Sequence, residues 1–248
     1  MNIAIIGKGR VATHLARALF SAGHEVTMCG GRHRTQPVPA EAEVVILSVK
    51  DSAISQVAQT LADSKALVLH TSGSVPMDAI PSVRHGVFYP LQTFSLDRNV
   101  DFRKIPLFLE ARTEEDMALL AQLASDISDT HMPMDGERRK TLHLAAVLCC
   151  NFVNHLYSIS HDILAEQRIP FSTLFPLMEE TLDKVRALSP HDAQTGPAVR
   201  WDENVMQSHL SMLANPIRRE IYRILSESIH LAHTHNSSVA DNDKLRPQ

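Results

Sequence analysis

The fold of this chain is decided by residues 2–12, which read Asn2-Ile3-Ala4-Ile5-Ile6-Gly7-Lys8-Gly9-Arg10-Val11-Ala12. The apolar run 2–6 has the length and bounds of a buried parallel strand, and a helical pattern follows it as far as Gly23. Residues 7–12 fit G-x-G-x-x-A, the form of turn that binds the pyrophosphate of a dinucleotide between a strand and a helix.

Each small residue of this motif is required for a steric reason. Gly7 permits the tight turn, Gly9 lets the backbone approach the pyrophosphate, and Ala12 lets the helix pack on the strand. We expect the amides of Arg10 and Val11, at the positive end of the helix, to contact the same group. The alternative is a glycine-rich turn that holds no ligand.

The end of the second predicted strand, residues 24–29, favours NADP(H) over NAD. An NAD-binding unit places an acidic residue there to hold the ribose 2′-hydroxyl. This sequence instead continues Cys29-Gly30-Gly31-Arg32-His33-Arg34. Arginine binds phosphate through planar, bidentate donors, so we assign Arg32 and Arg34 to the 2′-phosphate. The alternative is two solvated loop arginines.

Strands and helices alternate through the first half of the chain. Further strands are predicted at 42–49, 66–69, 86–89 and 105–109, with helices at 54–61 and 114–127. This alternation predicts an α/β fold, a Rossmann-type doubly wound parallel sheet, over residues 1–135. From residue 136 the pattern is all helical, with segments at 137–165, 172–188, 203–214 and 216–233. Residues 234–248 carry almost no apolar side chains and are predicted to form a disordered tail.

Composition excludes several classes of function. The 248 residues are 44% hydrophobic and 21% charged, as in an ordinary globular protein, and a net charge of −4 argues against nucleic-acid and membrane partners. No apolar run approaches the ~20 residues of a spanning helix, and the chain opens directly into a strand, so we expect a cytoplasmic protein. The 3 cysteines make no disulfide framework, and the 14 histidines show no metal-ligand spacing, so no metal is predicted.

The helix predicted over 137–165 carries the candidate catalytic residues. At ~100° per residue one narrow stripe holds Lys140, His143, Val147, Asn151, Asn154, Ser158 and His161. The opposite face is apolar and suits a core. Specific hydrogen-bonding groups with little charge suit a polar cleft, so we assign catalysis to His143 and Asn151 and a substrate contact to Asn154. The alternative is an ordinary exposed face.

Further candidates lie in loops between the predicted elements. Ligands of an open α/β sheet bind outside the carboxyl ends of the strands, which assigns Val49 and Ser72 to the cofactor and Gln92 to the substrate. The segment 194–202 joins two helices and holds the only tryptophan, and from it we assign Thr195 and Arg200 to the substrate. The alternative there is a surface connection in which Arg200 pairs with Asp202.

Several of these stretches together resemble a known family. They are Gly7 to Ala12, His70 to Ser74, Gly86 to Phe94, His143 to Ala146, Asn151-Phe152 and Gln194 to Ala198. The sequence resembles, over residues 1–233, an uncharacterised bacterial family that pairs a Rossmann-like domain with a C-terminal helical domain of unknown function (DUF2520-type). More distantly it is similar to pyrroline-5-carboxylate reductase, ketopantoate reductase and the 6-phosphogluconate dehydrogenase group. That resemblance implies NAD(P)-dependent chemistry and a helical domain that dimerises to complete the active site.

Two functions follow as hypotheses. The first is an NADP(H)-dependent oxidoreductase that reduces a C=O or C=N bond of a small polar metabolite. In it His143 is the general acid, Asn151 polarises the acceptor, and Arg200 binds a carboxylate. The second is a non-catalytic NADP(H)-binding sensor or partner protein. In either case apolar faces at 172–188 and 216–231 predict a homodimer through the helical domain.

Overall fold

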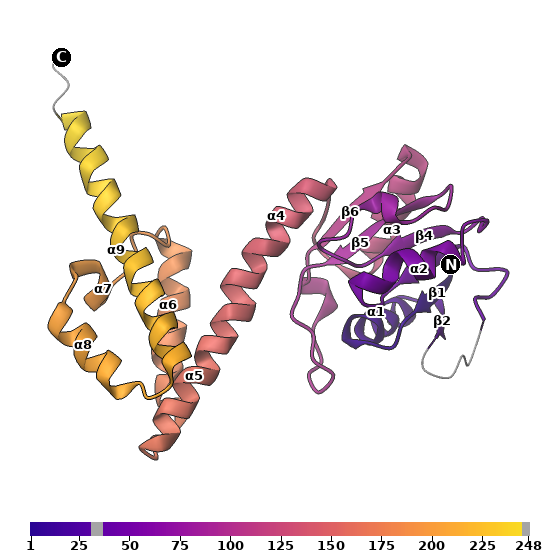
Figure 1. Cartoon of the computed structure of the whole chain (residues 1–248). Coiled ribbons are helices and arrows are strands. Elements are labelled where there is room, and N and C mark those ends of the chain that lie inside the picture. Colours follow the sequence, from indigo (N-terminus) through magenta and orange to yellow (C-terminus); the bar gives the residue numbers. More distant parts are fainter. Residues whose placement is uncertain (31–36, 245–248) are drawn as a thin grey trace. The chain divides into compact units, whose positions relative to one another are not determined.

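The computed structural model describes residues 1–30 and 37–244, with side chains as far as Thr234 (Figure 1). The chain divides into two compact units, one spanning Met1–Val153 and the other beginning at Asn154. The predicted change to helices at residue 136 coincides with the start of α4 (Gly136–Ala146). The first unit nevertheless continues to Val153, because α4 carries contacts to the sheet that are described below.

The first unit is built on one sheet. In the described part of the chain it has seven strands in the order β2-β1-β3-β4-β5-β6-β7. Their bounds are β1 Asn2–Ile6, β2 Glu25–Cys29, β3 Val44–Leu47, β4 Leu67–His70, β5 His85–Pro90, β6 Leu107–Ala111 and β7 His131–Pro133. The strand order reverses between β1 and β3, which is the switch point of a doubly wound sheet. The Rossmann-type fold predicted from the sequence is therefore confirmed.

One strand departs from a wholly parallel sheet. β6 runs antiparallel to β5, from Gly86 opposite Ala111 to Pro90 opposite Leu107. The connection between them contains only the short 3₁₀ turn η3 (Phe102–Lys104) and no crossover helix, so the chain returns in the opposite direction. The edge strand β7, parallel to β6, was not predicted, because His-Met-Pro has no alternating pattern.

Helices cover both faces of this sheet. α1 (Arg10–Ser21) and α3 (Glu114–Ile127) pack on one face, where Leu15, Leu19 and Leu120 are fully buried. The 3₁₀ turn η1 (Asp51–Ala53) leads into α2 (Ile54–Gln59), which packs on the other face. A second 3₁₀ turn, η2 (Met77–Ala79), follows β4. The sheet is thus buried on both sides, as parallel strands require.

The second unit is helical. Its elements are the 3₁₀ turn η5 Phe171–Leu174 and the helices α5 Val153–Glu166, α6 Phe175–Ala187, α7 Pro197–Arg200, α8 Glu203–Met212 and α9 Pro216–Lys244. All four predicted helical segments are present. α9 continues to Lys244 and so runs into the segment 234–248 that the sequence predicts to be disordered. Ten residues beyond Thr234 extend a helix that is already nucleated, which removes the initiation cost that a free polar tail would face.

The helix from α4 to α5 contains a π-helical segment, η4 (Val147–Phe152). The whole helix, Gly136–Glu166, is long and apolar enough to cross a membrane by length and composition, with a mean hydropathy of 1.3 in its most apolar window. This contradicts the expectation from the sequence that no apolar run is long enough to span a membrane. One helix of this kind is a weak indication of a membrane span, because core helices of globular proteins meet the same criteria. Leu148 and Phe152, predicted to face a core, are about half exposed at 54% and 53%.

Candidate functional site

The glycine turn after β1 has the geometry of an anion-binding loop. Gly7 has a φ of +139°, and a Cβ there would lie 2.1 Å from the carbonyl oxygen of Ser48. Only glycine meets both conditions. Gly9 precedes α1 without a side-chain cap, and a Cβ on it would meet nothing within 4 Å. The first amides of α1, from Arg10 to Ala12, therefore have no acceptor within the helix.

This turn lies at the same edge of the sheet as three other strand ends. β1, β3, β4 and β5 are neighbours and run parallel, so Gly7, Val49, Ser72 and Tyr89 all come at or just after the carboxyl ends of their strands. Thr71 donates its hydroxyl to Ser48 Oγ at 3.4 Å and so ties two of these ends together. Ligands of an open α/β sheet bind at this edge.

The loop after β4 is held in place by its own hydrogen bonds. Ser72 Oγ donates to the Asp51 carboxylate at 2.8 Å and accepts the backbone N–H groups of Ser74 and Val75 at 3.1 Å each. Ser74 Oγ donates to the same carboxylate at 2.8 Å. Ser72, which the sequence assigns to the cofactor, is buried, and its hydroxyl holds this loop together; the cofactor contact stays a prediction.

His70 is a buried, neutral part of the same loop. Its Nδ1 accepts the backbone N–H of Ser72 at 3.2 Å, so Nε2 carries the proton and donates to the Pro76 carbonyl at 3.3 Å. Burial, followed by the nearby Arg139 charge, lowers the pKa of His70 from 6.5 to about 4. The ring therefore stays uncharged near neutral pH.

His143 meets Tyr89 beside this loop. Its Nδ1 lies 3.0 Å from the Tyr89 hydroxyl, and the two rings pack edge to face with centroids 6.1 Å apart. Gly73 presses against the same imidazole, since a Cβ on Gly73 would lie 2.6 Å from Nδ1. Burial raises the pKa of Tyr89, so the phenol keeps its proton at neutral pH. His143 Nε2 makes no hydrogen bond within the described residues, and the ring is half-buried.

A buried arginine fixes α4 so that this contact forms. Asp135 caps the helix by accepting the Arg138 N–H at 2.8 Å. Arg139, fully buried, forms an ion pair with Glu110 on β6 and donates to the Val75 carbonyl at 2.8 Å. Arg139 and His143 are four residues apart and share a helix face, so the ion pair that anchors one directs the other toward the sheet.

The structure does not bring Asn151 to His143 within the first unit. Asn151 lies in the π-helical segment, is exposed, and is about 12 Å further along the helix. The polar stripe predicted at a constant 100° per residue shifts there, because a π turn contains more residues than an α turn. Gln92 is also exposed, and its Oε1 accepts the neighbouring Thr93 N–H at 2.8 Å. Arg32 and Arg34 lie outside the described residues.

The remaining predicted residues belong to the second unit. Asn154 borders a cavity that Tyr157, His161 and Phe171 also line. Thr195 precedes Gly196, whose φ is +113°, and Arg200 ends the short helix α7. Asp202 does not pair with Arg200 in the described part of the chain, because it caps α8 by accepting the Val205 N–H at 3.2 Å. The substrate contacts assigned to Asn154, Thr195 and Arg200 stay predictions.

Sequence reasoning did not single out five residues of this cluster: Asp51, Gly73, Tyr89, Glu110 and Arg139. Gly73 is next to Ser72 and Tyr89 is three residues before Gln92, two of the residues assigned from the sequence. Arg139 belongs to the run Glu137-Arg138-Arg139-Lys140, which is typical of a solvated helix start. Its spacing of four residues from His143, which places both on one helix face, was the one available signal.

Comparison with known proteins gives a family and a fold. Residues 105–229 match the family model described as "Domain of unknown function (DUF2520)". A Bacteroides fragilis protein designated an NADP oxidoreductase is 42% identical, with a TM-score of 0.87, over 92% of this chain and 97% of that one. A Thermotoga maritima protein is 22% identical, with a TM-score of 0.69, over 91% and 98%. Plasmodium falciparum pyrroline carboxylate reductase, solved with NADP bound, shares the fold at 9% identity and a TM-score of 0.60, over 94% and 98%. A search of curated proteins found no match.

Proposed function

Because this chain belongs to the DUF2520 family, whose Bacteroides fragilis relative is designated an NADP oxidoreductase, we propose that it is an NADP(H)-dependent reductase. Its substrate is a small polar metabolite with a C=O or C=N bond. The observation that carries this proposal is the Tyr89–His143 pair, a proton-donating group at the sheet edge where the glycine turn also lies.

The residues of the turn fit the cofactor. The open space over Gly9 and the unpaired first amides of α1 suit a pyrophosphate, and the edge from Val49 to Gly73 suits the reactive ring. Arg32 and Arg34 would bind the 2′-phosphate, because a guanidinium group donates two parallel hydrogen bonds to phosphate oxygens. The nicotinamide supplies the hydride when NADPH is bound.

His143 supplies the proton. As an imidazolium it donates from Nε2 to the oxygen or nitrogen of the acceptor, while Nδ1–H donates to the Tyr89 oxygen. A hydroxyl both accepts and donates, so Tyr89 holds the ring in its charged and its neutral state. Gly73 and Arg139 position the imidazole, the first by direct packing and the second through α4.

NADPH oxidation by the purified protein, measured against a panel of 2-oxo acids, aldehydes and cyclic imines, tests the reaction. We expect turnover with at least one class and a loss of about 100-fold or more in kcat for His143→Ala, the usual range for removal of a general acid. His155→Ala, which changes an exposed histidine of the second unit, is the matched control. Unchanged turnover in His143→Ala would contradict the assignment.

Cofactor preference is tested separately. Arg32→Ala should weaken NADPH binding by about 10-fold or more and leave NADH binding nearly unchanged, because only NADPH carries the 2′-phosphate. Equal losses for both nucleotides would argue against this role. Saturable NADPH binding without turnover on any substrate class would favour the alternative, a non-catalytic sensor or partner protein.

We propose further that the second unit pairs with a second copy of the chain. Among its described residues only Ala198, Met206 and Ser226 are buried, whereas large apolar side chains are widely exposed. A cavity of about 410 Å³ between α5, α8 and α9 is lined largely by Leu156, Ile159, Ile163, Ile221 and Leu225. A unit with so small a core of its own needs a partner surface, and an identical unit offers the same apolar faces in return.

A further inference from the structure

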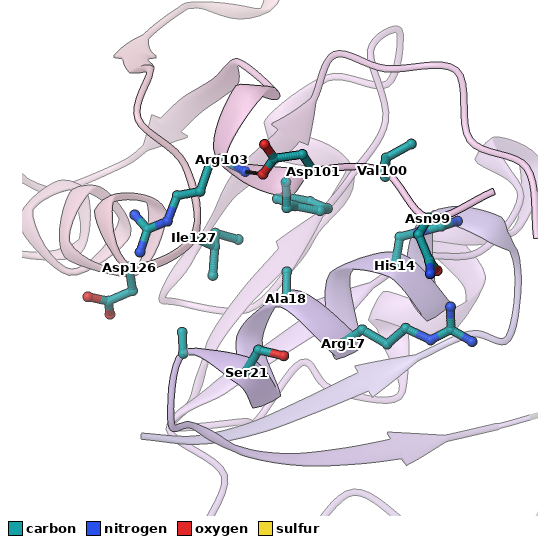
Figure 2. Close-up of a pocket in the computed structure, with 12 residues that line it drawn as sticks. His14, Arg17, Ala18, Ser21, Asn99, Val100, Asp101, Arg103, Asp126 and Ile127 are labelled. Atoms are coloured by element: carbon teal, nitrogen blue, oxygen red, sulfur yellow. Dashed lines mark hydrogen bonds between the residues drawn. The ribbon is translucent and has the colours of Figure 1, made fainter.

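A second cavity lies in the first unit, on the face of the sheet that α1 covers. Its volume is about 380 Å³, and it opens between the middle of α1, the segment 99–103 and the end of α3 (Figure 2). Its polar lining consists mainly of His14, Arg17, Ser21, Asn99, Arg103 and Asp126. Arg17 is eight residues beyond Gly9, about 12 Å along the helix, so the cavity is separate from the glycine turn.

Three of the charged groups at this cavity already have partners. The Arg103 guanidinium donates to the Ser125 carbonyl at 3.1 Å and faces Asp129 at 3.6 Å. Asp126 pairs with His24 at 3.1 Å, and Asp101 pairs with Lys104 at 3.6 Å. Each of these three groups thus has a partner within the protein, which leaves the other end of the cavity to provide donors for a ligand.

The other end of the cavity has donors without partners. In Figure 2, His14, Arg17 and Asn99 lie at one end of the view, and Arg103 and Asp126 lie at the other. The side chains of Arg17 and Asn99 make no hydrogen bond or ion pair with any part of the chain that the structure describes. A guanidinium and an amide that face one cavity together suit an anion.

His14 adds an acceptor beside these donors. The side chain is buried, with 5% of its surface exposed, and it packs on Phe94 at 5.2 Å between centroids. Its Nε2 lies 2.8 Å from the Ser95 carbonyl oxygen, so in the neutral ring Nε2 carries the proton and Nδ1 is an acceptor. Across residues 1–30 and 37–244, Nδ1 has no hydrogen-bond partner. Nδ1 is therefore an acceptor in the cavity wall that a donor group of a ligand can reach.

We propose that this cavity binds a small organic anion, a carboxylate or a phosphate monoester, that also carries a hydroxyl or amino group. Arg17 and Asn99 donate to the anion, and His14 Nδ1 accepts from the hydroxyl or amino group. Ala18 and Val100 contact the carbon skeleton. The volume is in the range of small-molecule sites, and the ligand binds apart from the dinucleotide, as an effector would.

Calorimetric titration of the full-length protein tests the proposal with glycerate and 3-phosphoglycerate as probes. Propionate lacks the hydroxyl, and glycerol lacks the anion. We expect saturable binding of glycerate or 3-phosphoglycerate and at least about tenfold weaker binding of propionate and glycerol. Binding of 3-phosphoglycerate alone, together with inorganic phosphate, identifies a phosphate site. Binding of glycerate identifies a carboxylate site. The absence of saturable binding by either probe overturns the proposal.

Variants separate this cavity from other sites. Arg17→Ala should weaken probe binding by about tenfold or more, while the matched control Arg112→Ala, also an exposed arginine, should change it less than about twofold. His14→Phe keeps an aromatic ring against Phe94 and removes the Nδ1 acceptor, so the preference for glycerate over propionate should disappear. Full-strength binding in Arg17→Ala, or displacement of the probe by NADP⁺, would show that the ligand binds elsewhere.

Discussion

The packing of Gly73 against His143 gives the sharpest test of the candidate site, because it can be made without a substrate. In Gly73→Ala the new methyl carbon would lie 2.6 Å from Nδ1, 2.7 Å from Cγ and 2.9 Å from Cβ of His143. Ordinary contacts begin near 3.5 Å, so the imidazole has to withdraw by about 1 Å. Withdrawal on that scale also stretches the 3.0 Å hydrogen bond to Tyr89 beyond its useful range.

The expected cost follows from these contacts. Overpacking in a tight site costs ~1–3 kcal/mol, and loss of a neutral hydrogen bond adds ~1 kcal/mol. We therefore expect Gly73→Ala to lower the free energy of unfolding by about 2–3 kcal/mol. In a His143→Ala background the contacts to Nδ1 and Cγ are gone and only the Cβ contact at 2.9 Å remains. The Cβ contact still requires a shift, so the same substitution should then cost about 1 kcal/mol less than in the wild type, because the hydrogen bond to Tyr89 is no longer lost with it.

Urea unfolding of the wild type, the two single variants and the double variant measures the coupling between positions 73 and 143. Gly9→Ala is the matched glycine control. A Cβ there meets nothing within 4 Å and the φ is an ordinary −77°, so stability should be unchanged while NADPH binding falls. Equal destabilisation by Gly73→Ala in both backgrounds would refute the contact between Gly73 and the His143 ring, and with it the position of the proposed acid.

Three further predictions concern the framework of the site and the second unit. Arg139→Ala leaves Glu110 without its partner and should lower the unfolding free energy by about 3 kcal/mol in urea titrations; a loss below ~1 kcal/mol would mean that the ion pair does not anchor α4. The pKa of His70 is 6.5 in the unfolded chain and about 4 in the folded one, so below pH 6.5 the unfolded state binds more protons. Stability is thus complete above pH 6.5 and should fall by up to about 3 kcal/mol toward pH 4, and His70→Gln, but not His155→Gln, should flatten this slope. Size-exclusion chromatography with light scattering should give twice the chain mass of 27.5 kDa, and Leu182→Glu, on the exposed apolar face of α6 in the second unit, should shift the protein toward monomer; a wild-type monomer at micromolar concentration would contradict pairing.

The sequence by itself determined the Rossmann-type sheet and the position of the glycine turn. Both are encoded locally. The strand, Gly7, Gly9 and the start of α1 are consecutive residues, and the requirement for a positive φ at Gly7 can be inferred from the turn alone. The helices of the second half could also be predicted from the sequence, because their apolar residues recur at helical spacing.

Only the tertiary structure decided which side chains meet at the sheet edge. His143 and Tyr89 are 54 residues apart, and their contact depends on where α4 lies against the sheet. That position is set by the Arg139–Glu110 ion pair across 29 residues and by the absence of a side chain on Gly73. The π-helical turn at Val147–Phe152 could not be predicted either, because a helical pattern assumes a constant number of residues per turn. That assumption placed Asn151 and His143 on one face of the helix. Local sequence patterns indicate secondary-structure propensity and periodicity, whereas the partner of a buried charge depends on how distant elements pack in the tertiary structure.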